Sequence, residues 1–177
     1  GNAGFDFSVQ VGGEPKFKDG TVSRKGGICL YSNSSVDLNY IREEAKSGRM
    51  GEKLMAVVCE GNKERVYLSP TSCQIPDFTN IESVWKSALL IPKKHRDFKP
   101  PIYGMEHFGD LFSKRQAVVL STSSDLISEV IEMLKQREDI EKEYVVALST
   151  YLSFVLDKCA DYWSSVCSWN SSRDIVR

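Results

Sequence analysis

The feature that most constrains the fold is a long uncharged run near the C-terminal end. Residues 144–156, YVVALSTYLSFVL, contain no charged side chain over 13 positions and lie within a helical pattern that extends over residues 140–169. A helix needs about 20 consecutive apolar residues to cross a bilayer, so this run is too short to span one. A helix that is apolar nearly all round normally lies in a protein core. The sequence therefore predicts one long buried helix and no membrane partner.

A second helix is predicted just before this one. Apolar residues recur at helical spacing after a start rich in Ser, Thr and Asp, and residues 137–139 predict a turn between the two helices. The recurring positions are Leu126, Ile127, Val130, Ile131 and Leu134. The C-terminal third is therefore expected to be helical.

The N-terminal part is predicted to form mainly strands. Apolar and polar residues alternate over residues 5–11, which predicts a half-buried strand, and residues 28–31 predict a second short strand. Two further runs, 53–59 and 65–68, are joined by Gly and Asn at 61–63 and predict a hairpin.

Two short helices are expected among these strands. Leu38, Ile41 and Ala45 recur at helical spacing, and the helix should stop at Gly48. Residues 80–90 predict the other short helix. The fold class is therefore α+β, with antiparallel strands followed by a helical C-terminal half. We expect a strand-rich part over residues 1–99 and a helical part over residues 100–177, together forming one compact unit excised from a longer protein.

Neither a metal site nor a catalytic centre is predicted. Cys29-Leu30-Tyr31-Ser32 has the placement of a zinc knuckle, but Ser32 stands where the second Cys would be, so the ligand count fails. The chain has 2 histidines, and neither belongs to a recognisable nucleophile pattern. No glycine-rich nucleotide-binding loop is present, so no cofactor is expected in this segment. The 5 cysteines form no Cys-x-x-Cys pair, which favours reduced thiols in the cytoplasm.

Basic residues form two groups that could contact nucleic acid. Lysine and arginine neutralise phosphates, and a neighbouring ring such as Phe98 can stack on a base. The alternative is a solvated charged surface, which a net charge of -1 favours. The candidate DNA-binding residues are Lys93, Lys94, Arg96 and Lys99 in a proline-bounded loop, and Lys114, Arg115 and Gln116 further along the chain.

Five stretches of the chain, taken in order, carry a family resemblance. They resemble the middle of the large adenine-specific DNA methylases described as containing a Zn-ribbon. The stretches are GTVSRKGGIC (20–29), YIREEAKSGRMGEKLMAVVCEG (40–61), RVYLSPT (65–71), YGMEHFGDLFSKRQ (103–116) and ADYWSSVCSWNSSRDIV (160–176).

The resemblance implies that the chain is a non-catalytic central segment of an AdoMet-dependent adenine-specific DNA methyltransferase. In the family, the AdoMet-binding glycine motif precedes this segment and the Asp-Pro-Pro-Tyr motif follows it. The implied role is target recognition or DNA positioning while the target base is flipped out of the duplex. Ser32 departs from the family's Cys-x-x-Cys, which leaves a Zn-ribbon-like remnant, and Phe108 stands where the family tends to have Trp.

Two other functions compete with this interpretation. The chain could be a structural module that packs on the remainder of the methylase chain or on a partner chain, including a second copy of itself, without touching DNA. An independent small enzyme would need a convergent polar cluster in a pocket, and the sequence shows none.

Overall fold

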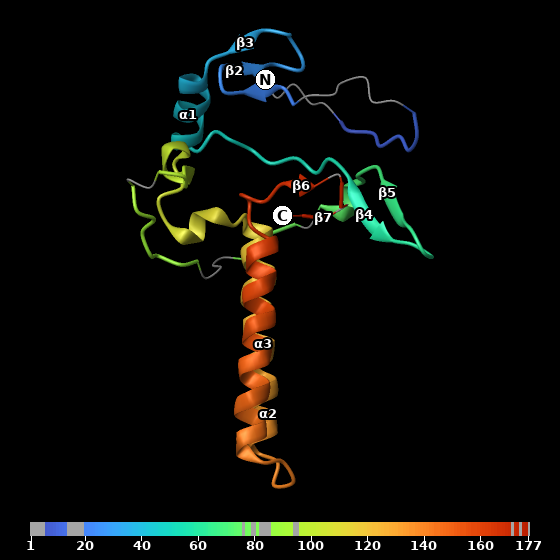
Figure 1. Ribbon diagram of the computed structural model, residues 1–177, viewed down its shortest axis with the longest axis vertical. Helices are drawn as coiled ribbons and strands as arrows, with labels where there is room; N and C mark the ends of the chain where they lie inside the picture. Colours follow the sequence, from blue (N-terminus) through green and yellow to red (C-terminus); the bar gives the residue numbers. More distant parts are fainter. Residues whose placement is uncertain are drawn as a thin grey trace. The chain divides into compact units, whose positions relative to one another are not determined.

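The computed structural model describes residues 6–13, 20–75, 77–78, 81, 86–93, 96–170, 172–173 and 175–176 (Figure 1). The predicted α+β class is confirmed, because antiparallel strands occupy the N-terminal half and two long helices the C-terminal half. The chain divides into two compact units, Gly1–Asp77 and Phe78–Arg177. Among the described helices, none combines the length and apolar character needed to cross a membrane.

The first unit contains a small antiparallel sheet that leads into a helix. Its strands β1 (Val22–Ser23), β2 (Gly26–Ile28) and β3 (Ser35–Val36) lie in that order. Gly26 has a φ of 136°, and a Cβ there would lie 2.5 Å from the carbonyl oxygen of Val36, so only glycine fits this crossing. The strand expected at 28–31 is thus found earlier, at 26–28, and residues 29–33 form a turn.

Helix α1 (Leu38–Lys46) forms as the apolar spacing predicts. Its N-cap is Asp37, whose side chain accepts a hydrogen bond of 2.7 Å from the backbone N–H of Asn39. At the other end, Gly48 adopts a φ of 68°, the left-handed conformation that commonly ends helices.

The predicted hairpin is confirmed as β4 (Val57–Glu60) paired with β5 (Arg65–Leu68). The 3-10 helix η1 (Ser72–Gln74) follows it. The strand predicted at 5–11 is wrong over its described part, residues 6–11, which form no ladder. There the backbone N–H of Val9 instead donates 2.9 Å to the hydroxyl of Ser69.

The second unit begins with two segments that bond to each other through their backbones. Phe108 N–H donates to Leu89 at 2.9 Å, Gly109 N–H donates to Ser87 at 3.1 Å, and Ile91 N–H donates to Glu106 at 2.8 Å. The 3-10 helices η2 (Pro100–Tyr103) and η3 (Phe108–Leu111) belong to this region. These bonds join residues on both sides of residue 99 within the second unit, which begins at Phe78.

The same backbone pairing explains why residues 86–90 of the short helix predicted at 80–90 are not helical. Residues 80 and 82–85 of that prediction lie outside the described residues. Residues 86–90 are not helical, and Leu90 forms an isolated antiparallel bridge with His107. Their backbone groups bond across to the 107–109 segment, which competes with the local bonds of a helix.

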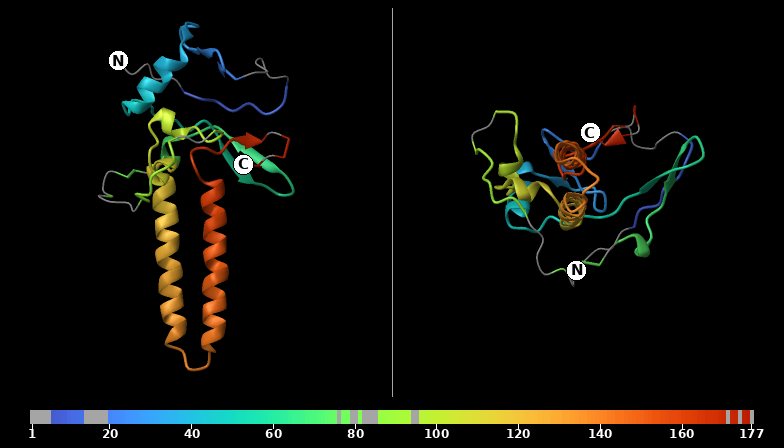
Figure 2. Two further views of the ribbon diagram at one scale, coloured as in Figure 1. Left: turned by 60° about the vertical axis from the view of Figure 1, so that its left-hand side comes forward. Right: turned by 90° about the horizontal axis from the view of Figure 1, so that it is seen from below.

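Two antiparallel helices dominate the second unit, α2 (Lys114–Lys135) and α3 (Lys142–Tyr162), and lie side by side over their length (Figure 2). The predicted turn joins them at 137–139. The chain then forms a short hairpin of β6 (Trp169–Asn170) and β7 (Ile175–Val176). The helix predicted over 140–169 thus ends earlier, at Tyr162.

The prediction of a buried C-terminal helix is wrong. Of the residues in α3 only Val145 is buried, whereas Tyr151 is 70% exposed. Among the described elements, α2 is the main neighbour of α3, so most of the circumference of α3 stays exposed. The buried hydrophobic side chains of the described part are Ile91, Leu111, Ala117, Ile131 and Val145.

Candidate functional site

The basic loop between Ile91 and η2 carries its own acidic partners. Lys93 Nζ lies 3.2 Å from a carboxylate oxygen of Glu106, and Arg96 Nε lies 3.0 Å from Asp97. All four side chains are half exposed or more, so each ion pair contributes little stability and its charges stay accessible. Lys94 lies outside the described residues, and Lys99 is exposed beside the start of η2.

The second basic group, at the start of α2, is largely used within the fold. Lys114 Nζ donates 2.7 Å to the carbonyl of Phe78. Gln116 Oε1 accepts from Ser113 N–H at 2.8 Å and from the Ser165 hydroxyl at 3.0 Å. The Arg115 side chain is exposed and forms no hydrogen bond or ion pair with any residue that the structure describes.

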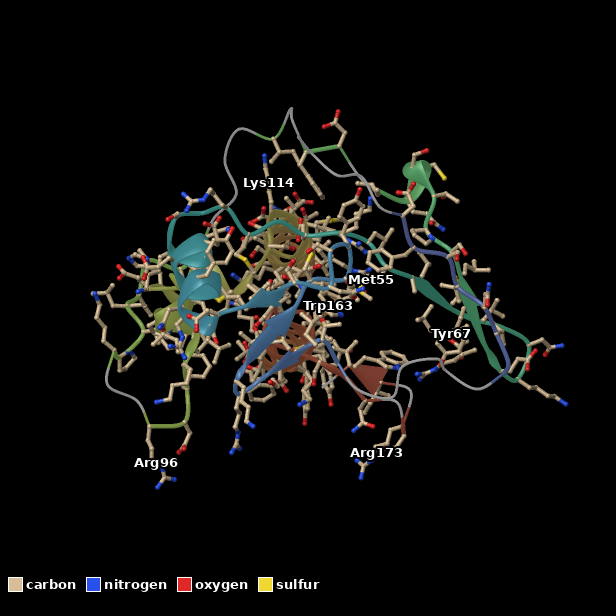
Figure 3. All side chains as sticks on the ribbon, turned by 90° about the horizontal axis from the view of Figure 1, so that it is seen from above. Met55, Tyr67, Arg96, Lys114, Trp163 and Arg173 are labelled. Atoms are coloured by element: carbon tan, nitrogen blue, oxygen red, sulfur yellow. The ribbon has the colours of Figure 1, made fainter. Side chains whose placement is uncertain are left out.

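The structure does not bring these two basic groups together. Seen from above, Arg96 and Lys114 extend to different sides of the second unit (Figure 3). The candidate DNA-binding residues therefore form two separate positions. In the loop, Glu106 and Asp97 offset the charges of Lys93 and Arg96.

His107 and Asp110 form a hydrogen-bonded turn. Asp110 Oδ2 accepts from the backbone N–H groups of Glu106 at 3.0 Å and of His107 at 2.8 Å, and the His107 ring Nδ1 lies 3.3 Å away. Partial burial by itself would raise the pKa of Asp110, but hydrogen bonds from the His107 backbone, the His107 ring and the Glu106 backbone outweigh it and lower the pKa. The carboxylate thus caps η3, which is a structural role.

The knuckle-like turn at Cys29 is closed by backbone hydrogen bonds. Cys29 N–H donates to Ser34 at 2.9 Å, and Asn33 N–H donates back to Cys29 at 2.8 Å. The Ser32 hydroxyl, followed by the backbone N–H groups of Ser32 and Tyr31, lowers the pKa of Cys29 by hydrogen bonding to the thiolate. Ser32 stands where a knuckle would have a second thiolate, and its hydroxyl donates to the Ser34 hydroxyl at 3.0 Å. The described residues contain no cluster of three or more His, Cys, Asp or Glu side chains that could hold a metal ion.

An exposed apolar surface on the helical hairpin is the feature that sequence reasoning missed. One row of large apolar side chains on α2 and one row on α3 remain accessible to solvent, with Met133 68% exposed and Val155 60% exposed. We call these two rows the apolar hairpin face. Its members are Val119, Leu126, Val130 and Met133 on α2, and Tyr144, Tyr151, Val155 and Tyr162 on α3.

Both rows lie on the same side of the hairpin. On α2 the exposed Leu126 and Val130 each precede by one residue the inward-facing Ile127 and Ile131, and on α3 Tyr144 precedes the buried Val145 in the same way. One residue corresponds to about 100° around a helix. Because the two helices are antiparallel, the same step turns both rows toward one common side.

The other side of the hairpin is mainly polar, with the exposed Val146 of α3 as an apolar exception. A shallow groove between α2 and α3 is lined largely by hydroxyl and charged side chains, including Ser128, Glu132 and Lys135 of α2 and Ser149 and Ser153 of α3. The hairpin therefore has one mainly polar side and one apolar side. The signal for this was present in the sequence as a second set of apolar positions on α2, offset by one residue from the first.

Comparisons of the chain with protein-family models, with curated proteins and with solved structures found no match.

Proposed function

We propose that this chain is a non-catalytic association module that joins parts of a larger assembly through its helical hairpin. The observation that carries the proposal is the apolar hairpin face. Monomeric soluble proteins rarely leave a contiguous apolar surface of this extent open, and such surfaces commonly mark sites of protein–protein contact.

The exposed rings on α3 strengthen this interpretation. Tyrosine is enriched at protein interfaces, since its ring contributes apolar area and its hydroxyl remains able to hydrogen-bond at the rim. Tyr144, Tyr151 and Tyr162 all belong to the apolar hairpin face. Isolated exposed apolar residues are ordinary, but two aligned rows on neighbouring helices are not.

The assembly that we propose is an AdoMet-dependent adenine-specific DNA methyltransferase. The support is the ordered resemblance of the five stretches between residues 20 and 176 to the middle of that family. In this proposal the AdoMet site and the catalytic motif lie outside the segment. We place the assembly in the cytoplasm, where five free thiols would stay reduced.

Dye binding tests the association role. At high dilution, 1-anilinonaphthalene-8-sulfonate should fluoresce with the chain and lose most of that signal in the double variant Leu126→Lys and Val155→Lys. Val146→Lys is the matched control, because Val146 is 66% exposed on the same helix but lies outside the apolar hairpin face. Equal dye binding by the chain and the double variant would show that the face is not a docking surface.

Direct contact with DNA is the second candidate function. It is favoured by the side chain of Arg115, which is exposed at the start of α2 and forms no hydrogen bond or ion pair with a described residue. Unlike Lys114 and Gln116, this side chain is not used by the fold. It can therefore extend toward a phosphate without breaking a hydrogen bond inside the unit.

Salt-dependent binding to duplex DNA tests this second role. Arg115→Glu should weaken binding and reduce the slope of log affinity against log salt by about one, as expected for one lost phosphate contact. Lys142→Glu, at the far end of the hairpin, is the control and should change binding little. A triple change of Lys93, Lys94 and Arg96 to Glu reports on the loop separately. Affinity that ignores both salt and all these changes would reject DNA contact.

A further inference from the structure

We propose that a second copy of this chain covers the apolar hairpin face, so that two hairpins form a symmetric four-helix bundle. The inference rests on the proposed association role and names its partner. Three observations carry it: the spacing of the exposed apolar residues, the area that the face can bury, and its near lack of charge.

The spacing on α2 is that of a helix with two helical neighbours. The row toward α3 runs through positions 117, 120, 124, 127, 131 and 134, and it is apolar except at Ser124. The second row runs through 119, 123, 126, 130 and 133, and it consists of exposed apolar side chains except at Ser123, which is polar and half-buried. Each row alternates steps of three and four residues, the spacing of knobs-into-holes packing. In a four-helix bundle each helix packs on two neighbours, so it needs two such rows about a quarter turn apart. The hairpin supplies the first neighbour of α2 and leaves the second row open.

The area of the face is sufficient for a stable dimer. A helix of about 22 residues is about 33 Å long. Two packed helices lie about 8–10 Å apart and each is about 10 Å across, so together they are about 18 Å wide and the face measures about 600 Å² per chain. Two copies would bury about 1,200 Å² in total, the lower end of the range for specific interfaces. A single helix laid on the same face would bury less of it.

The side-chain chemistry of the face is self-complementary. Its α2 row is aliphatic and its α3 row is mainly aromatic, and a twofold axis parallel to the helices places α2 of one copy opposite α3 of the other. One charged side chain, Lys158, lies at the spacing of the α3 row, between Val155 and Tyr162. Its Nζ is already paired with Asp161 at 2.7 Å and lies 4.6 Å from the centre of the Tyr162 ring. No unpaired charge on the two rows would oppose its own copy or call for a charged partner.

Sedimentation equilibrium with a matched pair of variants tests the inference. The unmodified chain should sediment at twice its mass of 19.9 kDa at micromolar concentration. Val155→Lys should shift the dissociation constant upward at least a hundredfold, because two lysines would enter the symmetric interface. Val146→Lys should leave the dimer intact. Both residues are exposed valines of α3, so far-UV circular dichroism should show equal helicity in all three proteins.

The outcomes separate this inference from the proposed function. A monomeric chain whose dye binding still depends on Leu126 and Val155 would overturn the second copy as occupant while leaving the association role intact. A dimer unaffected by Val155→Lys, or disrupted equally by Val146→Lys, would also overturn the inference. Aggregates without a defined stoichiometry would do the same. A monomer whose dye binding is insensitive to the face would refute both proposals.

Discussion

At the scale of single residues, two polar side chains fix the geometry of the second unit where backbone groups would otherwise lack partners. Asp110 accepts from two consecutive backbone N–H groups, and Gln116 links the start of α2 to Ser165 beyond the end of α3. Both residues belong to the stretch YGMEHFGDLFSKRQ, which also carries candidate DNA-binding positions. The structure uses most of that stretch to join η3 to the hairpin.

Asp110→Ala should lower the free energy of unfolding at pH 7 by about 0.5–1 kcal/mol, toward the low end for a helix cap because the side chain is partly exposed. The pKa of this carboxyl is lower in the folded chain, so its contribution is present above the unfolded pKa and is lost as pH falls through the folded pKa. The difference between variant and parent should therefore shrink in acid.

Urea unfolding at neutral and acidic pH measures this effect. Asp157→Ala removes an exposed carboxylate from α3 and should change stability little at either pH. A penalty for Asp110→Ala that persists unchanged in strong acid would mean that the carboxylate charge is not involved.

Gln116→Ala removes the acceptor for both Ser113 N–H and the Ser165 hydroxyl. The free energy of unfolding should fall by about 1 kcal/mol, the usual cost of a lost cap hydrogen bond. Thermal and urea denaturation measure the change. Gln136→Ala, on the exposed turn between the helices, serves as the control. Equal stability of the two variants would contradict the linking role of Gln116.

At the scale of elements, close backbone contact decides where the second unit departs from its predicted secondary structure. Residues 80–90 have a helical pattern, yet the described residues 86–90 lie against 107–109. Gly109 permits this approach, since a Cβ there would lie 2.7 Å from both Lys86 Cβ and the Ser87 carbonyl oxygen. The backbone of Gly109 is not in a left-handed conformation, so space alone selects glycine.

Gly109→Ala should therefore destabilise the chain by about 1–3 kcal/mol, the range for inserting an atom into a packed contact. Gly51→Ala is the matched control, because its Cβ would meet nothing within 4 Å and its φ is not positive. Chemical denaturation of the two variants gives the comparison. A neutral Gly109→Ala would show that these two segments separate easily.

The two long helices show that an apolar pattern predicts where a helix forms but not whether that helix is buried. Apolar spacing predicts that both helices exist, because this signal acts within a few residues. Their ends differ from the prediction: α2 begins at Lys114, before the Ser/Thr/Asp-rich stretch, and α3 ends at Tyr162 instead of residue 169. Burial is not a local property, because a side chain is buried only when another segment of the chain covers it. The uncharged run at 144–156 predicted a central helix, but α2 covers one side of α3 and leaves Tyr151 and Val155 in solvent.

At the scale of the whole molecule, the chain consists of two compact units. The piece 78–177 should keep the helicity of α2 and α3 when it is produced without residues 1–77, because the bonds that hold the hairpin's open end lie within this unit. These include Ser165 N–H to Leu111 at 2.7 Å. Far-UV circular dichroism measures the helicity. The piece 100–177 is the control. It should be less stable than 78–177, because it lacks Leu89, whose carbonyl accepts from Phe108 N–H.

The candidate functional positions follow the same distinction between local and distant signals. The basic residues near 93–99 and 114–116 are visible in the sequence, but their partners are not. Glu106 reaches Lys93, and the carbonyl of Phe78 accepts from Lys114, across 13 and 36 residues respectively. Such contacts depend on chain reversals that no short pattern encodes, so the sequence could not tell which cations remain accessible.

The sequence by itself determined the α+β class, helix α1 with its stop at Gly48, the β4–β5 hairpin and the turn between the long helices. Each depends on capping, turn or periodic signals spanning only a few residues. Only the tertiary structure decided that 86–90 would pair with 107–109, that the basic groups would separate, and that α3 would keep an apolar side open. Each of these depends on which distant segment lies alongside, and apolar side chains specify that burial is needed without specifying the partner.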